Sequence, residues 1–146
     1  MTVDTPQPSL NVKTKPYLFE PLCFLDIEMT DTDPLKGKVA EIAVYITSGD
    51  LRQQFLVANF VIKLDLSEVT RNDEVVKRFT KSGLWQDLQN PEKVTQLVDA
   101  EELIIKQLEE YGICRGQMPS AGIQAYNDRI CLEREMPSFN KFLNFT

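Results

Sequence analysis

The stretch "CFLDIEMTDTDP", residues 23–34, places two carboxylates, Asp26 and Glu28, one residue apart at the end of a short apolar run. The apolar residues predict the first strand of the chain, largely buried, over residues 22–27. Because side chains alternate along a strand, both carboxylates leave the same face, roughly 7 Å apart at a rise of ~3.3 Å per residue. Like charges repel each other in a partly buried position, so the pair needs a physical reason.

Three explanations of this acidic pair are open from the residues alone. The carboxylates are solvated at the edge of the strand, or they pair with a lysine or an arginine, or they bind a divalent cation. A cation such as Mg²⁺ removes the repulsion and prefers hard oxygen ligands. Two such ions about 4 Å apart activate a water and stabilise the leaving oxygen in phosphodiester hydrolysis. That site needs further acids from elsewhere in the chain.

The composition restricts the class of protein. The 146 residues, of which 42% are hydrophobic, fit one ordinary domain with its own core. The net charge of −6 argues against binding of long nucleic acid, which requires many neutralised phosphates. Short oligonucleotides held by bound metal and a few local contacts remain compatible with this charge.

Targeting signals and membrane spans are not apparent in the sequence. The first twenty residues resemble neither a secretory signal nor a transit peptide, and no apolar run is long enough to cross a bilayer. The chain has no histidine, which excludes a Cys/His metal site, and Cys23, Cys114 and Cys131 are widely separated. We therefore predict an intracellular protein with reduced, mostly buried thiols, located in the cytoplasm or alternatively in the mitochondrion.

The first half of the chain reads as consecutive strands. A run rich in Val, Ile and Tyr predicts a strand over residues 39–47, the turn signal "SGD" follows at 48–50, and a further strand is predicted over residues 55–64. Three strands joined by short turns predict an antiparallel meander.

The second half of the chain reads as mostly helical. A short helix is predicted within residues 67–84, broken at Ser82-Gly83, and Thr95 is the predicted N-cap of a longer helix that ends at Gly112. The acidic residues within 99–110 are interpreted as the solvated face of this longer helix. Its apolar face is predicted at steps of three and four residues: Leu97, Ala100, Ile104, Leu108 and Tyr111.

The end of the chain predicts one more strand and one more helix. The strand is expected within residues 118–123, and the helix over residues 125–135, stopped by Pro137. Strands followed by helices that alternate with a strand indicate an α/β fold, with a mixed sheet flanked by helices. We expect a flexible lead over residues 1–16 and one domain over residues 17–146.

The sequence also resembles a known family. The segment "FLDIEMTDTDP" resembles the first motif of the oligoribonucleases, in the DEDD superfamily of 3′→5′ exonucleases, which is an apolar run followed by Asp-x-Glu-Met-Thr and Asp-Pro. The block "EIAV", the "SGL" turn and the last segment, "PSAGIQAYNDRICLEREMPSFNKFLNF", match later parts of that family in order. Asp128 falls on the acid of the second motif, and the resemblance covers residues 17–146.

The resemblance implies a ribonuclease H-like fold with a five-stranded mixed sheet. It implies a metal-dependent 3′→5′ exoribonuclease, usually a homodimer, that hydrolyses short RNA oligonucleotides to nucleoside 5′-monophosphates with two Mg²⁺ or Mn²⁺ ions. Asp26, Glu28 and Asp128 would be the catalytic acids and metal ligands, with Asp26 bridging the ions. Met29 and Thr30 would line the terminal nucleotide, partly through backbone groups.

Departures from the family pattern keep a second hypothesis open. The family's fourth acid and its catalytic histidine lie downstream of the end of this sequence, so we expect a domain that lacks the C-terminal part of the family fold. The alternative function is therefore that of an inactive or partner-dependent oligoribonuclease-like chain with a structural or binding role. Substrate-contact positions of the family differ in this sequence at Asp31, Thr32, Ile123, Gln124, Phe145 and Thr146.

Overall fold

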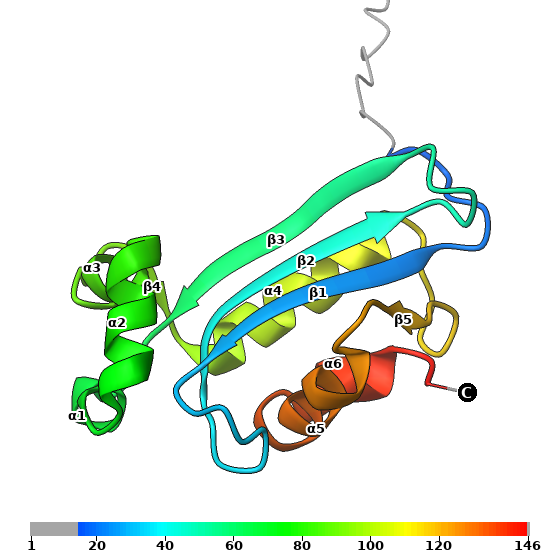
Figure 1. Cartoon of the computed structure of the whole chain (residues 1–146). Coiled ribbons are helices and arrows are strands. Elements are labelled where there is room, and N and C mark those ends of the chain that lie inside the picture. Colours follow the sequence, from blue (N-terminus) through cyan, green and yellow to red (C-terminus); the bar gives the residue numbers. More distant parts are fainter. Residues whose placement is uncertain (1–14, 146) are drawn as a thin grey trace, which may run out of the picture.

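A computed structural model describes residues 15–145, and the flexible lead predicted for residues 1–16 lies outside them except for its last two residues. The described residues form a mixed five-stranded sheet in the order β4-β3-β2-β1-β5, with helices packed around it (Figure 1). This arrangement confirms the α/β class and is consistent with a ribonuclease H-like fold. The strands are β1 (Leu22–Met29), β2 (Val39–Thr47), β3 (Gln54–Ile62), β4 (Val94–Thr95) and β5 (Ser120–Ala121).

The predicted antiparallel meander is confirmed for β1, β2 and β3. β2 lies in the centre and is buried at most positions, as expected for its run of Val, Ile and Ala. The short strands extend this meander at both edges, because β5 pairs in parallel with β1 and β4 pairs in parallel with β3. Of these two, β5 falls within the predicted segment, whereas β4 was not predicted.

β1 differs from the prediction in length and burial. It continues past Ile27 to Met29, because its pairing with β2 includes Asp26 opposite Ala43 and Glu28 opposite Glu41. The two acids thus lie within the strand rather than beyond its end. Most of β1 is half-buried rather than buried, since these acids occupy one of its faces.

Residues 15–145 contain six helices, and local signals explain where α2 begins and where it ends. The predicted break at Gly83 is confirmed, because its φ of 85° lies in the left-handed region that favours glycine and separates α2 from α3. Asn72 caps α2 by accepting hydrogen bonds from the backbone N–H groups of Glu74 and Val75. The helices are α1 (Leu66–Thr70), α2 (Asp73–Ser82), α3 (Leu84–Leu88), α4 (Leu97–Glu110), α5 (Ala125–Glu135) and α6 (Pro137–Phe142).

One boundary prediction is wrong and another is confirmed. Thr95 is not the N-cap of α4, because it lies in β4 and pairs with Ile62 of β3. The cap position falls on Gln96, which makes no side-chain cap bond. Pro137 follows the end of α5 as predicted, but it also begins α6. Proline is well tolerated at the first position of a helix, where its missing N–H has no intrahelical partner.

Among the described helices, none combines the length and the apolarity needed to cross a bilayer.

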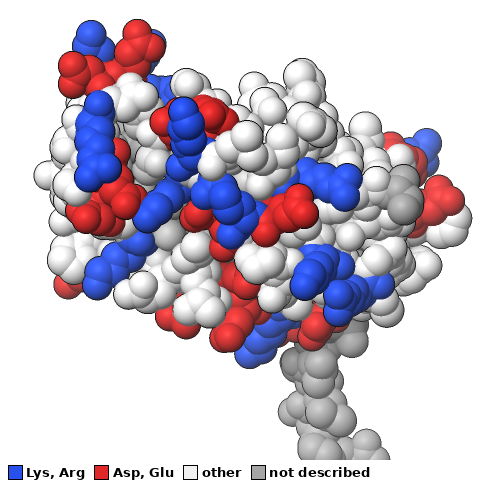
Figure 2. Space-filling model, turned by 90° about the horizontal axis from the view of Figure 1, so that it is seen from below, with Lys and Arg blue, Asp and Glu red and all other residues white. Residues whose placement is uncertain are grey.

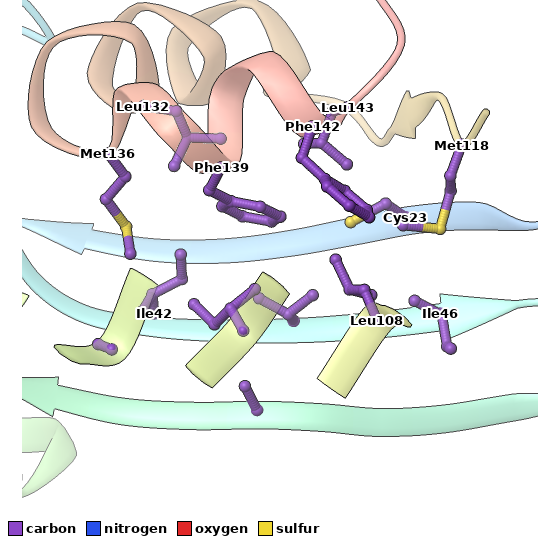
Figure 3. Packing of buried hydrophobic residues seen from close by; sticks show 14 of the residues in the cluster. Cys23, Ile42, Ile46, Leu108, Met118, Leu132, Met136, Phe139, Phe142 and Leu143 are labelled. Carbon is purple, nitrogen blue, oxygen red and sulfur yellow. The ribbon is translucent and has the colours of Figure 1, made fainter. Parts of the chain in front are cut away.

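The main core lies between the sheet and the helices α4 and α6 (Figure 3). Ile42 and Ile46 of β2, Leu108 of α4 and Phe139 of α6 are all fully buried. α4 lies behind the sheet, while α5 and α6 lie beside β1 (Figure 1). This packing sets the beginning of α5 next to β1.

The cysteines largely follow the prediction. Cys23 and Cys131 are buried in the core, and burial raises the pKa of Cys23 to about 12 and that of Cys131 to about 11. Cys114 is exposed. Two of the three thiols are thus buried, as the prediction of mostly buried thiols requires.

The acidic face of α4 needs a correction at one residue. Glu101 does more than face solvent, because its Oε2 accepts hydrogen bonds from the backbone N–H groups of Ser138 and Phe139, each at 3.1 Å. These are N–H groups of the first turn of α6, which have no partner within that helix. Glu101 therefore caps α6 from a distant helix.

Glu101→Ala is expected to lower the free energy of unfolding by about 1 kcal/mol, the usual loss for a removed helix cap. The neighbouring Glu102→Ala is the matched control, since Glu102 is exposed on the same helix. Urea denaturation of both variants measures the difference. Equal stability of the two variants would contradict the capping role.

Candidate active site

The three acids predicted from the sequence come together at one cavity. Asp26 and Glu28 project from β1, and Asp128 lies in the first turn of α5; all three line a cavity of about 840 Å³. The parallel pairing of Phe24 with Ala121 places the start of α5 beside the middle of β1. The sheet topology therefore joins acids that are about a hundred positions apart in the sequence.

Asp128 is the buried member of this group. Its exposed fraction is 8%, and its pKa is raised from the ordinary value of 3.8 to about 6. Burial is the larger cause, because it disfavours the charged form, and the negative charge of Asp26 is the second. Asp26 and Asp128 line the same cavity, where the charge of Asp26 adds to the effect of burial.

Glu28 is paired with an arginine that the sequence analysis missed. The Nε of Arg78, on α2, lies 3.4 Å from Oε2 of Glu28, and its Nη2 donates a hydrogen bond to the carbonyl oxygen of Met29 at 3.3 Å. Of the three explanations of the acidic pair, pairing with an arginine applies to Glu28. Asp26 is exposed to solvent. No sequence spacing signals this ion pair, because its partners are brought together only by the tertiary fold.

A further acid, Glu41, adjoins the site. Glu41 of β2 lies opposite Glu28 in the register of the sheet. Its pKa is raised, first by burial and then by the charges of Glu28, Asp26 and Asp87. The signal in the sequence is a single carboxylate within an otherwise apolar strand, in the block "EIAV".

The two predicted nucleotide contacts occupy different places. Met29 lines the cavity of the acids, whereas Thr30 lines a neighbouring cavity of about 320 Å³. Thr30 is buried, and its hydroxyl accepts a hydrogen bond from the backbone N–H of Lys38 at 2.9 Å. Thr30 thereby closes the base of the loop between β1 and β2.

The loop between β1 and β2 is tied to α5. The guanidinium of Arg134 donates hydrogen bonds to the carbonyl oxygens of Pro34, at 2.9 Å, and of Gly37. A side chain at Gly37 would meet the backbone of Asp31 at 3.0 Å, so the loop is closely folded there. These contacts couple the position of the helix that carries Asp128 to the strand that carries Asp26.

Most positions that depart from the family pattern also border the cavity. Asp31, Thr32, Ile123 and Gln124 are all among its lining residues, and Ile123 is fully exposed. The differences noted in the sequence are thus concentrated where a ligand would bind.

The acids that line the cavity have the ligand chemistry that a divalent cation prefers, but they are not arranged as a metal site. Carboxylate oxygens are the preferred ligands of Mg²⁺ and Mn²⁺, and a cation between Asp26 and Asp128 would offset the repulsion that raises the pKa of Asp128. Within residues 15–145, however, no group of three or more Asp, Glu or Cys side chains is arranged to hold a metal ion. Glu28 is paired with Arg78 instead.

Asp128→Asn is expected to stabilise the fold when divalent cations are absent. Because the pKa of Asp128 is raised in the folded state, its ionisation disfavours folding above pH 6, and this penalty fades as the pH falls from about 6 to about 4. The neutral, similarly shaped amide should therefore raise the free energy of unfolding by about 1–2 kcal/mol at pH 7.5. Urea denaturation in EDTA measures this gain.

The gain from Asp128→Asn should fall to about a third at pH 4.5, where the folded protein already carries the proton but most of the unfolded chain does not. Glu133→Gln, at an exposed position of α5, controls for the general loss of one negative charge. A gain of the same size at both pH values would refute the electrostatic explanation.

Comparisons with known proteins show similarity over most of the chain. The chain is similar to an oligoribonuclease of Coxiella burnetii, with 32% identity over 125 residues that cover 85% of this chain and 67% of the relative. It is 31% identical over 128 residues to a probable oligoribonuclease of Dictyostelium discoideum, covering 85% of this chain and 64% of the relative. An oligoribonuclease of Mycobacterium leprae is 26% identical over 129 residues, covering 88% of this chain and 59% of the relative.

The chain thus spans about three fifths to two thirds of the length of the curated relatives it matches. No model of a known protein family matches it. The similarity to the relatives nonetheless extends over most of the chain. By this similarity, with which the α/β fold is consistent, the chain belongs to the oligoribonuclease family.

Proposed function

We propose that this chain is a 3′→5′ exoribonuclease that hydrolyses short RNA oligonucleotides to nucleoside 5′-monophosphates. The observation that carries the proposal is the convergence of Asp26, Glu28 and Asp128 on one cavity, with the charge of Asp26 acting on Asp128. The relatives are named oligoribonucleases, which supports the substrate class. The reaction is the cleavage of a phosphodiester by water.

Metal dependence is part of the proposal. Asp26 and Asp128 would hold Mg²⁺ or Mn²⁺, and Glu28 would join them when Arg78 releases it. A bound divalent cation supplies Lewis acidity and lowers the pKa of a coordinated water. The protein side chains fix the position of this chemistry, since β1 and α5 are held together by β5 and by the contacts of Arg134.

The charge distribution supports short substrates over long ones. The net charge is −6, and basic and acidic side chains are intermixed across the face shown in Figure 2. A long nucleic acid requires an extended basic surface. A short oligonucleotide needs only the cavity, with Met29 against the terminal nucleotide and Thr30 supporting the adjacent loop.

Assembly and location extend the proposal. We propose a homodimer acting in the cytoplasm, with the mitochondrion as the alternative compartment. Phe139 and Phe142 are buried in the core, and the ring of Phe145 packs under the guanidinium of Arg129 at 4.4 Å. These residues therefore make contacts within one chain.

The test of the function is incubation with RNA of two to five nucleotides labelled at the 5′ end. In Mg²⁺ or Mn²⁺ we expect stepwise shortening from the 3′ end with release of nucleoside 5′-monophosphates, and no shortening in EDTA. An intact label pattern in both metals would contradict the proposed activity. Cleavage that persists in EDTA would contradict the metal dependence.

A binding role is the second candidate, and two observations favour it. Glu28 is engaged by Arg78, and the chain supplies no histidine as a general base, whose help is worth roughly 10²–10⁴-fold in rate. On this alternative the chain binds RNA or a partner subunit without turnover. Retention of labelled RNA without cleavage, in the same assay, would favour it.

A further inference from the structure

Arg78 is an unusual residue in the cavity of the acids. Among the described residues that line this cavity, it is the only one with a positive charge, alongside Asp26, Glu28, Asp31 and Asp128. RNA is an anion, so the carboxylates alone would repel it. A cation of the protein at this position is therefore a candidate partner for a phosphate of the substrate.

The contacts of Arg78 leave part of its binding capacity available. Its Nε lies near Glu28 and its Nη2 donates to the carbonyl oxygen of Met29, while the guanidinium carbon lies 5.5 Å from the centroid of the Phe79 ring. A guanidinium has five N–H donors in a fixed fork. The side chain of Arg78 is 48% exposed, so it can change partners without leaving a buried charge.

Glu28 cannot serve Arg78 and a divalent cation equally well. A cation that binds the carboxylate of Glu28 would compete with the guanidinium and weaken the ion pair. Guanidinium groups bind phosphate oxygens through paired N–H groups. Loss of the Glu28 contact would therefore turn Arg78 toward the phosphate of a bound nucleotide.

We infer that Arg78 is a substrate-positioning residue that pairs with Glu28 in the metal-free chain and binds an RNA phosphate once a divalent cation has taken Glu28. The inference rests on the proposed function, which it deepens. It differs from a purely structural role, in which Arg78 would only fasten α2 to β1. The two roles are separable, because only the first alters the affinity for metal and for RNA.

The experiment compares Arg78→Ala and Arg78→Lys with Lys77→Ala, which removes an exposed positive charge next to Arg78 on the same helix. One measurement is the equilibrium binding of a fluorescent RNA trinucleotide in Ca²⁺, with the absence of turnover verified. The other is a Mn²⁺ titration by electron paramagnetic resonance without RNA. Thermal unfolding of each variant reports on the structural role.

Arg78→Ala should weaken trinucleotide binding by about ten- to a hundredfold, as expected for a lost charge-assisted hydrogen bond. It should also bind Mn²⁺ several-fold more tightly, because the competitor of the metal for Glu28 is gone. Arg78→Lys, which keeps the charge but not the paired donors, should bind the trinucleotide with intermediate affinity. Lys77→Ala should match the unaltered chain in both measurements.

Trinucleotide binding by Arg78→Ala equal to that of Lys77→Ala, or an unchanged Mn²⁺ affinity, would overturn the inference while leaving the proposed function intact. If Arg78→Ala does not fold, Arg78→Lys decides, since undiminished trinucleotide binding by that variant would overturn the inference. No trinucleotide binding by the unaltered chain would overturn the inference and the proposed function together.

Discussion

Asp26→Asn is expected to abolish RNA hydrolysis while leaving the fold intact. The variant removes the negative charge that would hold a divalent cation next to Asp128, and we expect turnover of a labelled RNA dinucleotide to fall by at least about a hundredfold. Because Asp26 is exposed, the loss of its charge should change thermal stability little. The hydrolysis rate in Mn²⁺, with circular dichroism on the same sample, measures both expectations.

Two comparisons sharpen the test of Asp26. Asp99→Asn makes the same change at an exposed position of α4 outside the cavity, and it should keep the full rate. Asp26→Asn should also lower the pKa of Asp128, since the charge of Asp26 helps to raise it, and carbon NMR of the carboxyl group would detect this shift. An undiminished rate in Asp26→Asn would remove this residue from the catalytic group.

Phe139→Ala should have the largest effect on stability. Phe139 is fully buried on α6, among Ile42 and Leu108 of the main core (Figure 3). Truncation of a buried phenylalanine costs about 3–5 kcal/mol, from lost burial and from the cavity it leaves. Against a typical total of about 5–15 kcal/mol for a domain, this loss leaves the variant close to unfolding at 37 °C.

Tyr126→Ala is the control for Phe139→Ala. Tyr126 is an aromatic residue of the adjoining helix α5 with an exposed fraction of 77%, and its loss should change the free energy of unfolding by less than about 0.5 kcal/mol. Guanidinium denaturation monitored at Trp85 reports on both variants. Similar stability of the two would mean that α6 is not part of the cooperative core.

Elements with a strong local pattern were predicted well from the sequence. The strand over residues 39–47 and the helix over residues 125–135 have the predicted bounds, and the apolar face of α4 is buried at Ala100, Ile104 and Leu108 as predicted. Periodicity and turn residues carry this information, because they act within a few positions of the chain. The family resemblance added Asp128, which periodicity alone would not have linked to Asp26.

Features that depend on tertiary contacts were missed. β4 has two residues, too few for a pattern, and exists because Val94 pairs with Val61. The cap that Glu101 gives to α6 and the ion pair between Arg78 and Glu28 join segments 37 to 50 residues apart. Such contacts depend on how the helices pack around the sheet. The sequence alone therefore predicts that an acid on a helix face, such as Glu101, is solvated.

Under the proposed function, Asp26 and Asp128, with Glu28 beside them, bind a divalent cation in one cavity. Anomalous diffraction from crystals saturated with Mn²⁺ would locate this cation. We expect a Mn²⁺ peak at ligand distance from carboxylate oxygens of both Asp26 and Asp128. A clear peak elsewhere, with none between these two carboxylates, would contradict it.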